Sequence, residues 1–337
     1  MNHVKLLNFP DHHPVIPFDG KSGISINKSK HIVVSGFEII GPAEQTNKDE
    51  AMAHRLIDRH SFFQGRGIIG YNNINVRIRN NKVHHCNGGG IILKSSLDTF
   101  IDDNQVFENL RYTNNPESAV MLVGKSDDFT PEEIGDATPQ TLRWRVSNNQ
   151  VYNNWKLIPF WSSNYDDQNW VNKNKDDMFY PRPGYGSKSA EFIEHGDGIH
   201  TRCDDTNGRF EISENKVYRN GINGISVYRA RANTNIFNNV VYRNGRTPKT
   251  EPELRDNNAG MKINCYGPIR FYENKVMANN AADNIVQINE FDNCKINVLA
   301  SKDNRVCMGG VNDNAVGLVI RQAEPACKEY DVYNNFA

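Results

Sequence analysis

The chain has 337 residues, enough for one large domain or two ordinary ones, and 38% of them are hydrophobic. Its 39 Lys and Arg residues nearly balance its 40 Asp and Glu residues. Binding to phosphates needs a basic stripe, so this balance predicts no nucleic-acid partner. No run of about 18 apolar residues occurs, and we therefore expect no membrane partner. The 46 asparagines, often in pairs, favour turns over helices.

One short pattern recurs along the chain: a polar residue, Asn, any residue and Val, first seen in Arg79–Val83. Its valines are Val83, Val106, Val151, Val217, Val241, Val276 and Val306. Successive valines are 23, 45, 66, 24, 35 and 30 residues apart. The short intervals predict a repeat unit of about 22 to 25 residues, and the long intervals predict units that carry insertions.

Each unit is predicted to contain three short strands, because apolar residues alternate there with period two. The first strand opens on Gly or Ala, at residues 67–69, 90–94, 119–122, 198–202, 224–228 and 260–264. The second precedes the Asn pair, at residues 76–78, 100–101, 210–212, 235–237 and 269–271. The third follows the pair, as at residues 82–84 and 216–218. Such a unit buries no face alone, but stacked coils pair every backbone group with the coils above and below.

The recurring Asn is expected at a tight corner between strands. Asn tolerates a left-handed backbone there, and its side chain can hydrogen-bond to the Asn of the next coil. A helical solenoid would instead show apolar residues at i, i+3 and i+4, and that spacing is absent.

With these repeats, essentially the whole sequence resembles the right-handed parallel β-helix superfamily, the pectate-lyase-like fold. The resemblance implies an all-β, single-stranded right-handed solenoid. We predict one domain over residues 1–337, of about nine or ten coils with long loops on one side. Residues 4–20 resemble the first-coil segment of lyases similar to chondroitinase B and alginate lyases. The capping segment and earlier strand usual in that group are missing, which predicts a truncated chain or an unusual start to the helix.

Three insertions interrupt the coils, at residues 124–143, 155–195 and 246–258. In a β-helix such insertions become loops and build the binding cleft. Aromatic residues gather in and beside the largest insertion. They form either a satellite core or a stacking platform for sugar rings. The aromatic residues predicted to bind substrate are Trp161, Trp170 and Tyr185.

Aligning the first strands by their leading Gly-Ile predicts two columns of outward side chains. His200 and Lys262 lie in one column, and Arg202, Tyr228 and Asn264 lie in the other. Neighbouring strands are about 4.8 Å apart, and alternate residues of one strand about 6.6 Å. We therefore expect the first four of these side chains in one patch about 10 Å across.

These four residue types suit elimination at a uronic acid. Arg202 would neutralise the sugar carboxylate and the developing enolate. His200 or Lys262 would accept the C5 proton, and Tyr228 would act as acid or base. Similar clusters on this fold occur in polysaccharide lyases and uronate epimerases. The exposed face of a solenoid is also often merely solvated.

Five residues are candidates on weaker grounds. Gly89–Ser96 is similar to the Lys-Ser strand of lyases resembling chondroitinase B, but no carboxylate cluster lies beside it in the sequence. We therefore assign Lys94 to substrate binding, with Asp197 and Asn264. The acidic residues Asp197, Asp204 and Asp205 have three open interpretations: an inverting hydrolase pair, Ca²⁺ ligands, or caps at corners.

The remaining motifs predict little chemistry. Six cysteines without a CxxC are buried thiols or form one or two disulfides. His12-His13 and His84-His85 lack partner ligands at useful spacing and are interpreted as surface or corner histidines.

The leading functional hypothesis is an extracellular or cell-surface polysaccharide lyase that cleaves a uronate-containing glycan by β-elimination. The alternatives are an inverting glycoside hydrolase, a uronate epimerase and a non-catalytic glycan-binding or adhesion β-helix. Its partner is a polysaccharide, its cofactor at most Ca²⁺, and its assembly a monomer or a trimer.

Overall fold

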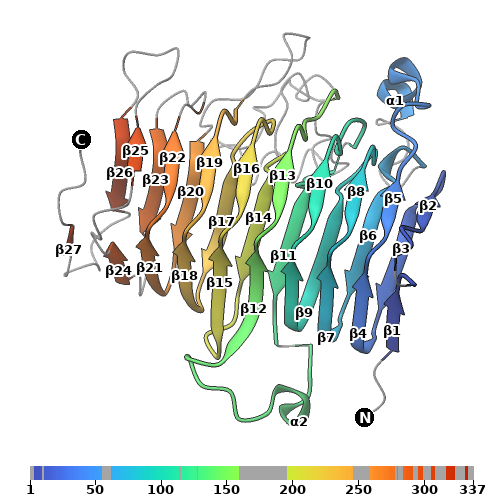
Figure 1. The fold of residues 1–337 in the computed structure, drawn as a ribbon. Helices are drawn as coiled ribbons and strands as arrows, with labels where there is room; N and C mark the ends of the chain where they lie inside the picture. The colour runs from blue at the N-terminus through green and yellow to red at the C-terminus, as the bar shows by residue number, and fades with distance from the viewer. Residues whose placement is uncertain are drawn as a thin grey trace, which may run out of the picture.

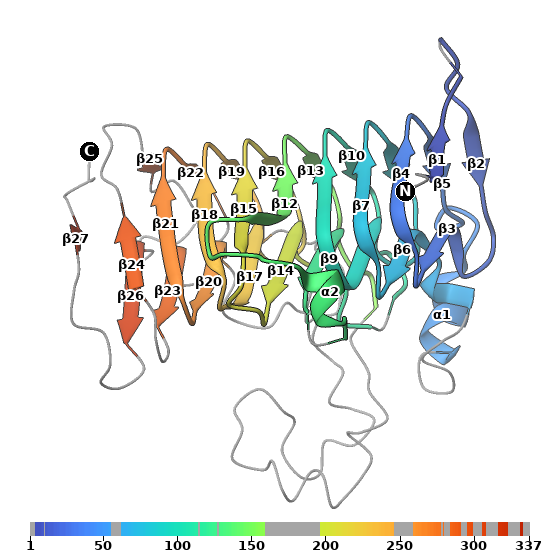
Figure 2. The same ribbon diagram turned by 90° about the horizontal axis from the view of Figure 1, so that it is seen from below.

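The chain winds into a right-handed parallel β-helix, seen from the side in Figure 1. The computed structural model describes residues 4–9, 11–54, 62–113, 115–126, 128–158, 196–245, 259–277, 279, 284–290, 295–298, 305–307, 316–322 and 331–332. Each coil contributes strands to three sheets, and successive coils lie side by side along the axis (Figure 2). The all-β solenoid predicted from the sequence is confirmed.

The three sheets are named in the order in which a coil passes through them. The first sheet contains β3 (Ser22–Asn27), β6 (Arg66–Tyr71), the start of β9 (Ile91–Asp102), β11 (Val120–Gly124), β14 (Ile199–Cys203), β17 (Ile225–Ala230), β20 (Ala259–Cys265), β23 (Asn284–Glu290) and β26 (Val316–Gln322). The second sheet contains β1 (Val4–Leu7), β4 (Lys30–Ser35), β7 (Ile74–Arg79), the end of β9, β12 (Leu142–Ser147), β15 (Arg209–Ser213), β18 (Asn233–Phe237), β21 (Pro268–Tyr272), β24 (Lys295–Val298) and β27 (Asp331–Val332). The third sheet contains β2 (Val15–Pro17), β5 (Glu38–Ile40), β8 (Lys82–His84), β10 (Gln105–Phe107), β13 (Gln150–Tyr152), β16 (Lys216–Tyr218), β19 (Val240–Tyr242), β22 (Lys275–Met277) and β25 (Arg305–Cys307). The nine strands of this third sheet, counted over the described residues, agree with the predicted number of coils.

The core fills the inside of the coils. The side chains that alternate with the predicted outward columns on β14, β17 and β20 are all buried, namely Ile199, Thr201, Ile225, Val227, Met261 and Ile263. All of them except Thr201 join one continuous apolar cluster with inward residues of the other two sheets. The period-two pattern therefore predicts the inside and the outside of these strands correctly.

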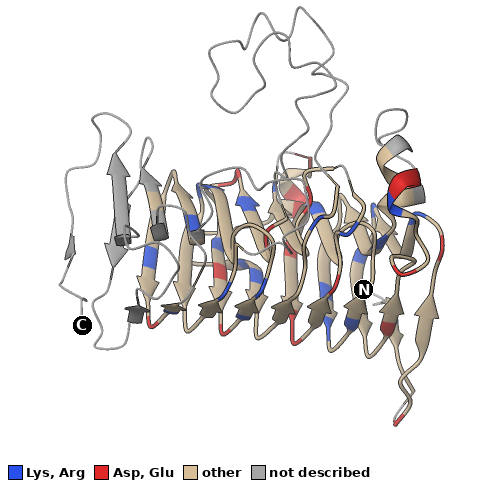
Figure 3. Ribbon diagram, turned by 90° about the horizontal axis from the view of Figure 1, so that it is seen from above, with Lys and Arg blue, Asp and Glu red and all other residues tan. Residues whose placement is uncertain are grey.

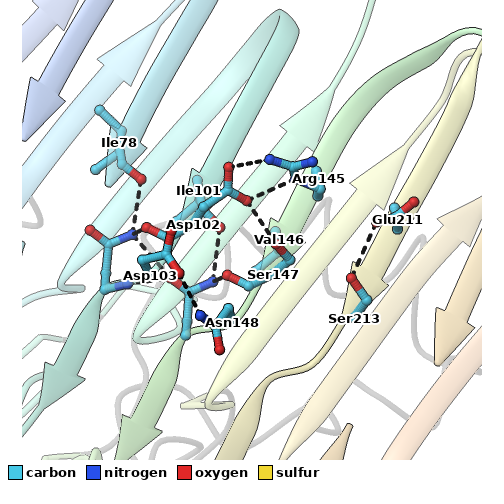
Figure 4. Close-up of polar contacts among 12 residues, drawn as sticks. Ile78, Ile101, Asp102, Asp103, Arg145, Val146, Ser147, Asn148, Glu211 and Ser213 are labelled. Carbon is cyan, nitrogen blue, oxygen red and sulfur yellow. Dashed lines mark hydrogen bonds and ion pairs between the residues drawn. The ribbon is translucent and has the colours of Figure 1, made fainter. Parts of the chain in front are cut away.

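A buried asparagine ladder forms at the corner between the second and third sheets. Asn104 Nδ2 donates to Asn149 Oδ1 over 3.0 Å, and the same contact recurs from coil to coil. Both side chains also donate to the backbone carbonyls of the preceding coil, at Ile78 and Ile101 (Figure 4). The predicted bond between Asn side chains of adjacent coils is confirmed. The left-handed residue is the one before the ladder Asn, as at Asp103, where φ is 59°.

A second asparagine ladder, which the sequence analysis missed, lies at the end of the third sheet. Its members are Asn109, Asn154, Asn220, Asn244 and Asn279. Each lies five residues after an Asn of the first ladder. This constant spacing is the sequence pattern that predicts the second ladder. Over the described residues, the six members of the first ladder and the five of the second are eleven of the 46 asparagines.

Removing one rung of the first ladder should destabilise the whole solenoid. In Asn149→Ala, the buried N–H and Nδ2 of Asn104 lose their common acceptor, which lies 3.0 Å away from each. We expect the free energy of unfolding to fall by about 2 to 4 kcal/mol. Denaturant unfolding measures this, with the exposed Asn207→Ala as the matched control. An equal effect in both variants would contradict the account of the ladder.

An aromatic column runs along the outer face of the third sheet. The rings of Phe107, Tyr152, Tyr218 and Tyr242 stack nearly parallel, with centroids 4.9 to 5.0 Å apart. Because each ring face covers its neighbour, these faces are not open to sugar rings. We therefore interpret the column as a packing element.

The three predicted insertions do not lie on one side. Residues 124–143 connect β11 of the first sheet to β12 of the second and contain α2 (Pro131–Ile134). Residues 155–195 and 246–258, by contrast, separate a strand of the third sheet from one of the first. α1 (Lys48–His54) and the short 3₁₀ helix η1 (Phe62–Gln64) follow β5 at that same corner. In Figure 1, α1 lies above the sheets and α2 below them.

Cysteines take both of the predicted forms. Cys86 and Cys203 are buried free thiols, whereas Cys265 is disulfide-bonded. Burial raises the pKa of the Cys203 thiol to about 12. Among the described residues, no helix has the length and apolar character needed to cross a membrane.

Candidate functional site

The register of the first sheet brings the predicted residues together. His200 of β14 pairs with Ser226 of β17, which pairs with Lys262 of β20. In the neighbouring column, Arg202 pairs with Tyr228. The predicted registration is confirmed for the His200 column and for Arg202 with Tyr228, though not for Asn264. It places His200 and Lys262 two strand spacings apart, about 9.6 Å along the axis.

The outward column containing His200 is accessible only along part of the helix. Its members on β6, β9 and β11 are Ile69, Ile92 and Met121, which are buried although they point away from the coil core. From β14 to β20 the column is polar, with His200, Ser226 and Lys262, and the His200 side chain is 19% exposed whereas Ser226 is buried. The accessible part of this column therefore begins at β14.

His200 is held by a buried carboxylate. Its Nδ1 lies 3.4 Å from Asp197 Oδ2, and the other oxygen of Asp197 accepts from the backbone N–H and the Nδ2 of Asn223 at 3.1 and 2.7 Å. The Asp197 side chain is only 6% exposed. A fixed carboxylate beside one ring nitrogen orients an imidazole and leaves Nε2 facing the other way. Asp197 therefore positions His200 instead of presenting a free carboxylate.

Arg202 is oriented by a neighbouring carboxylate as well. Its Nε and Nη2 both lie 2.6 Å from Asp204 Oδ2. A guanidinium has two edges that can bind a carboxylate in bidentate fashion, and Asp204 occupies the one that includes Nε. The edge formed by Nη1 and Nη2 is left for an anionic substrate. The guanidinium carbon also lies 5.8 Å from the centre of the Tyr228 ring.

A β-bulge adds a second arginine that the sequence analysis missed. Val227 pairs with Ile263 and Ala230 with Cys265, so two residues of β17, Tyr228 and Arg229, oppose the single Asn264 of β20. Bulges of this kind redirect side chains and occur often beside active sites.

Arg229 takes the left-handed conformation, with φ of 53°, and its guanidinium lies 5.5 Å from the centre of the Tyr228 ring. The sequence does contain a signal for this bulge. The inward residues Val227 and Ala230 of β17 are three positions apart, whereas their partners Ile263 and Cys265 of β20 are two positions apart. An uninterrupted outward column would make Asn264 the direct partner of Tyr228. Because of the bulge, these two residues do not pair.

The charges of the patch sum to an excess of one positive charge when His200 is neutral. Arg202, Arg229 and Lys262 contribute three cations, and Asp197 and Asp204 contribute two carboxylates. Figure 3 shows that acidic and basic residues are otherwise interspersed over the coils. A small cationic excess beside fixed donors favours an anionic ligand.

Lys94 lies on the more N-terminal part of the same sheet. It pairs with Tyr71, and a register irregularity separates it from β11. A carboxylate lies nearer to it than the sequence indicated. Burial raises the pKa of the Glu117 carboxyl, but the charge and hydrogen bonds of Arg66 and the charge of Lys94 outweigh burial and hold that pKa below its usual range. Glu117 also accepts from the backbone N–H of Gly89 at 3.1 Å, so its role is to fasten this corner.

Among the described residues, each of the three predicted calcium ligands is engaged by another group. Asp197 is bound to Asn223 and His200, Asp204 to Arg202, and Asp205 Oδ1 accepts from the backbone N–H of Asn207 at 2.8 Å. Within the described ranges, no three His, Cys, Asp or Glu side chains converge as metal ligands. The corner-capping interpretation fits Asp197 and Asp205 best.

The predicted aromatic platform lies outside the described residues, because Trp161, Trp170 and Tyr185 all fall in residues 159–195. A small satellite core does exist next to that segment, where Ile158 packs with Ala51 and Phe63. Trp144 of the same aromatic group is a core residue, and its Nε1 donates to the Ser96 carbonyl at 2.7 Å.

Comparison with known proteins gives two structural neighbours. No family model matches the sequence, and no curated protein matches it. The A-module of the mannuronan C-5 epimerase AlgE4 from Azotobacter vinelandii has 11% sequence identity and a TM-score of 0.41, over 88% of this chain and 63% of its own length. Pectate lyase Pel9A has 11% identity and a TM-score of 0.44, over 94% of this chain and 74% of its own. At such low identity, neither alignment assigns a role to any residue of this chain.

Proposed function

We propose that the first-sheet patch cleaves an acidic, uronate-containing glycan by β-elimination. The observation that carries the proposal is the pairing of an oriented imidazole with an oriented guanidinium on one strand. His200 and Arg202 project from the same face of β14, and each is held from behind by its own carboxylate. Because these groups are already held in place, no free energy is spent on reorienting them when charge develops on the substrate.

The residues divide the reaction among them. The free edge of Arg202, with Arg229 beside it, binds the carboxylate of the uronate and stabilises the charge that moves onto it. Nε2 of His200 takes the proton from C5, since the neutral imidazole offers a lone pair on this nitrogen. The C4–O bond then breaks as the C4=C5 double bond forms, and the Tyr228 hydroxyl gives its proton to the leaving oxygen. Lys262 supplies a second cation and is the alternative base.

The rival hydrolase is less well supported by the same geometry. An inverting hydrolase needs two carboxyl groups about 6.5–9.5 Å apart that face the glycosidic bond. Asp197 and Asp204 are turned toward His200 and Arg202 instead, and Asp205 toward Asn207. A uronate epimerase would use the same cations and base but return a proton to the opposite face of C5. We also propose that the protein acts on this substrate outside the cell or at its surface.

A panel of alginate, pectate, glycosaminoglycan and neutral glycans tests the proposal. We expect one acidic glycan to yield an unsaturated product that absorbs in the ultraviolet, and the neutral glycans to yield none. New reducing ends without that absorbance would indicate hydrolysis, and altered C5 configuration without cleavage would indicate epimerisation. Binding without any reaction would indicate an adhesion module. Each of these last three results would overturn the lyase assignment.

A further inference from the structure

The adjacent histidines His84 and His85 lie in a dense cluster of ionisable groups at the third sheet. Their Nδ1 atoms are 2.5 Å apart. Nε2 of His84 lies 3.0 Å from Glu38 Oε1. Nε2 of His85 lies 2.8 Å from Glu108 Oε2 and 3.0 Å from Glu44 Oε1. All four ring nitrogens of the pair therefore face a hydrogen-bonding atom, and the sequence had indicated no partners for them.

The fold builds this cluster from three successive coils. His84 ends β8, and its ring stacks on Phe107 of β10 with centroids 4.7 Å apart and planes at 13°. His85 takes the left-handed corner position that follows, with φ of 56°, and Glu108 takes the equivalent position one coil later, with φ of 54°. The repeat of the backbone thus brings a carboxylate of one coil against an imidazole of the previous one.

Counting the protons of the pair gives an unusual result. An ionised carboxylate only accepts hydrogen bonds, so each Nε2 that faces a glutamate carries a proton. The short contact between the two Nδ1 atoms requires one further proton, donated by one ring to the other. Two neutral imidazoles carry two protons in all, whereas this network holds three. This set of contacts is fully satisfied when His84 and His85 together bear one positive charge.

The charged groups around His84 and His85 stabilise one proton beyond the two of the neutral rings, and they oppose the binding of a second extra proton. Glu38 of β5, Glu44 of the loop after β5 and Glu108 of the corner after β10 face the rings, and Lys82 of β8 bonds to Glu38 at 2.5 Å. Burial lowers the pKa of His84, and the charges of its neighbours His85 and Lys82 lower it further, while Glu38 acts in the opposite sense. With both Nδ1 atoms protonated, the rings could no longer bond to each other.

We propose that His84 and His85 hold a single shared extra proton and form an acid-sensitive latch for the corner after β5. That corner is fastened to the same residues through its backbone, because Gly41 N–H donates to the His84 carbonyl at 2.9 Å and Ala43 N–H to the His85 carbonyl at 2.8 Å. A second proton removes the bond between the two Nδ1 atoms and sets two positive rings side by side, which loosens the corner. The latch is remote from the first-sheet patch and independent of the reaction assigned to it.

The direction of the pH effect follows from linkage. The pKa of His84 is lower in the folded chain than in the unfolded chain, so the unfolded chain binds more protons between the two values. Stability therefore falls as the pH drops from the ordinary histidine value, about 6.5, toward the lowered value.

A histidine NMR titration of the full chain tests the latch. In the wild type we expect the two rings to titrate as a coupled pair in two separated steps, with three ring N–H protons held at neutral pH. In His85→Asn, which tolerates the left-handed corner, His84 should titrate in one step and carry a single ring proton at neutral pH. The exposed His13→Asn should leave the pair unchanged.

A second variant covers the case in which His85→Asn does not fold. Glu108→Gln removes one stabilising charge, so the pair should lose its extra proton at a lower pH than in the wild type. The proposal is overturned if both wild-type rings titrate together as ordinary single histidines. It is equally overturned if neither variant changes the titration of His84.

Discussion

Replacing His200 by Ala should lower kcat by about 10²- to 10⁴-fold while KM changes little, because general acid–base catalysis contributes a factor of that size. His200 is the oriented base of the proposed elimination, and Asp197 fixes its ring from behind at 3.4 Å. The rate of unsaturated-product formation, measured on the glycan that the panel identifies, gives kcat and KM separately.

The matched control for this variant is Ser226→Ala. Ser226 neighbours His200 directly in the same outward column and carries no role in the mechanism. We expect it to retain turnover close to the wild type, which would exclude a general disturbance of the strand. If His200→Ala keeps full turnover, the base is another group, and Lys262 becomes the residue to replace.

Replacing Arg202 by Ala should reduce kcat/KM by about 10²- to 10³-fold, the effect of removing one preorganised donor to a developing anion. Arg202→Lys should restore little of this activity. A lysine cannot bond to Asp204 through one edge and offer a second bidentate edge to the substrate carboxylate, as the guanidinium does. A large recovery in Arg202→Lys would show that simple charge, and not this two-edged geometry, is what the site needs.

Arg219→Ala serves as the control for loss of positive charge. Arg219 is exposed and lies in a corner position after β16, at the end of the third sheet. Its replacement removes the same charge from the chain without touching the patch. Equal losses in the Arg219 and Arg202 variants would mean that net charge alone attracts the substrate.

The architecture could be predicted from the sequence because two signals coincide in most coils, from the Asn81 corner onward. Period-two alternation specifies which side chains enter the core, and the recurring Asn marks where the chain turns. Because strands of successive coils pair in parallel and in register, aligning Ile199 with Ile225 and Met261 is enough to align the outward residues as well. That is why the neighbours of His200 and Arg202 on β17 were identified correctly.

The details that escaped prediction are those that break the repeat. The bulge that presents Arg229 depends on one extra residue in a single strand, and the alternation pattern does not reveal its left-handed conformation. The position of the 124–143 loop, between the first and second sheets, depends on which two strands it connects. The amino-acid composition of the loop does not show which strands these are. Asp197 has a carboxylate that suits a metal ion, but one of its oxygens accepts hydrogen bonds from the backbone N–H and the side-chain amide of Asn223.

The His84-His85 pair illustrates the same limit. Its partners Glu38, Glu44 and Glu108 are 46, 41 and 23 residues away in sequence, and only the stacking of coils brings them into contact. The aromatic residues of the largest insertion lie outside the described residues, and their contribution to sugar binding stays a prediction.

A crystal structure of His200→Ala with an acidic oligosaccharide bound would test the common site of His200, Arg202, Tyr228 and Lys262 most directly. The account predicts one sugar carboxylate on the Nη edge of Arg202, with C5 of that ring facing position 200 and its leaving oxygen toward Tyr228. An oligosaccharide bound on another sheet, or lying over β14 with its carboxylates turned away from Arg202, would contradict it.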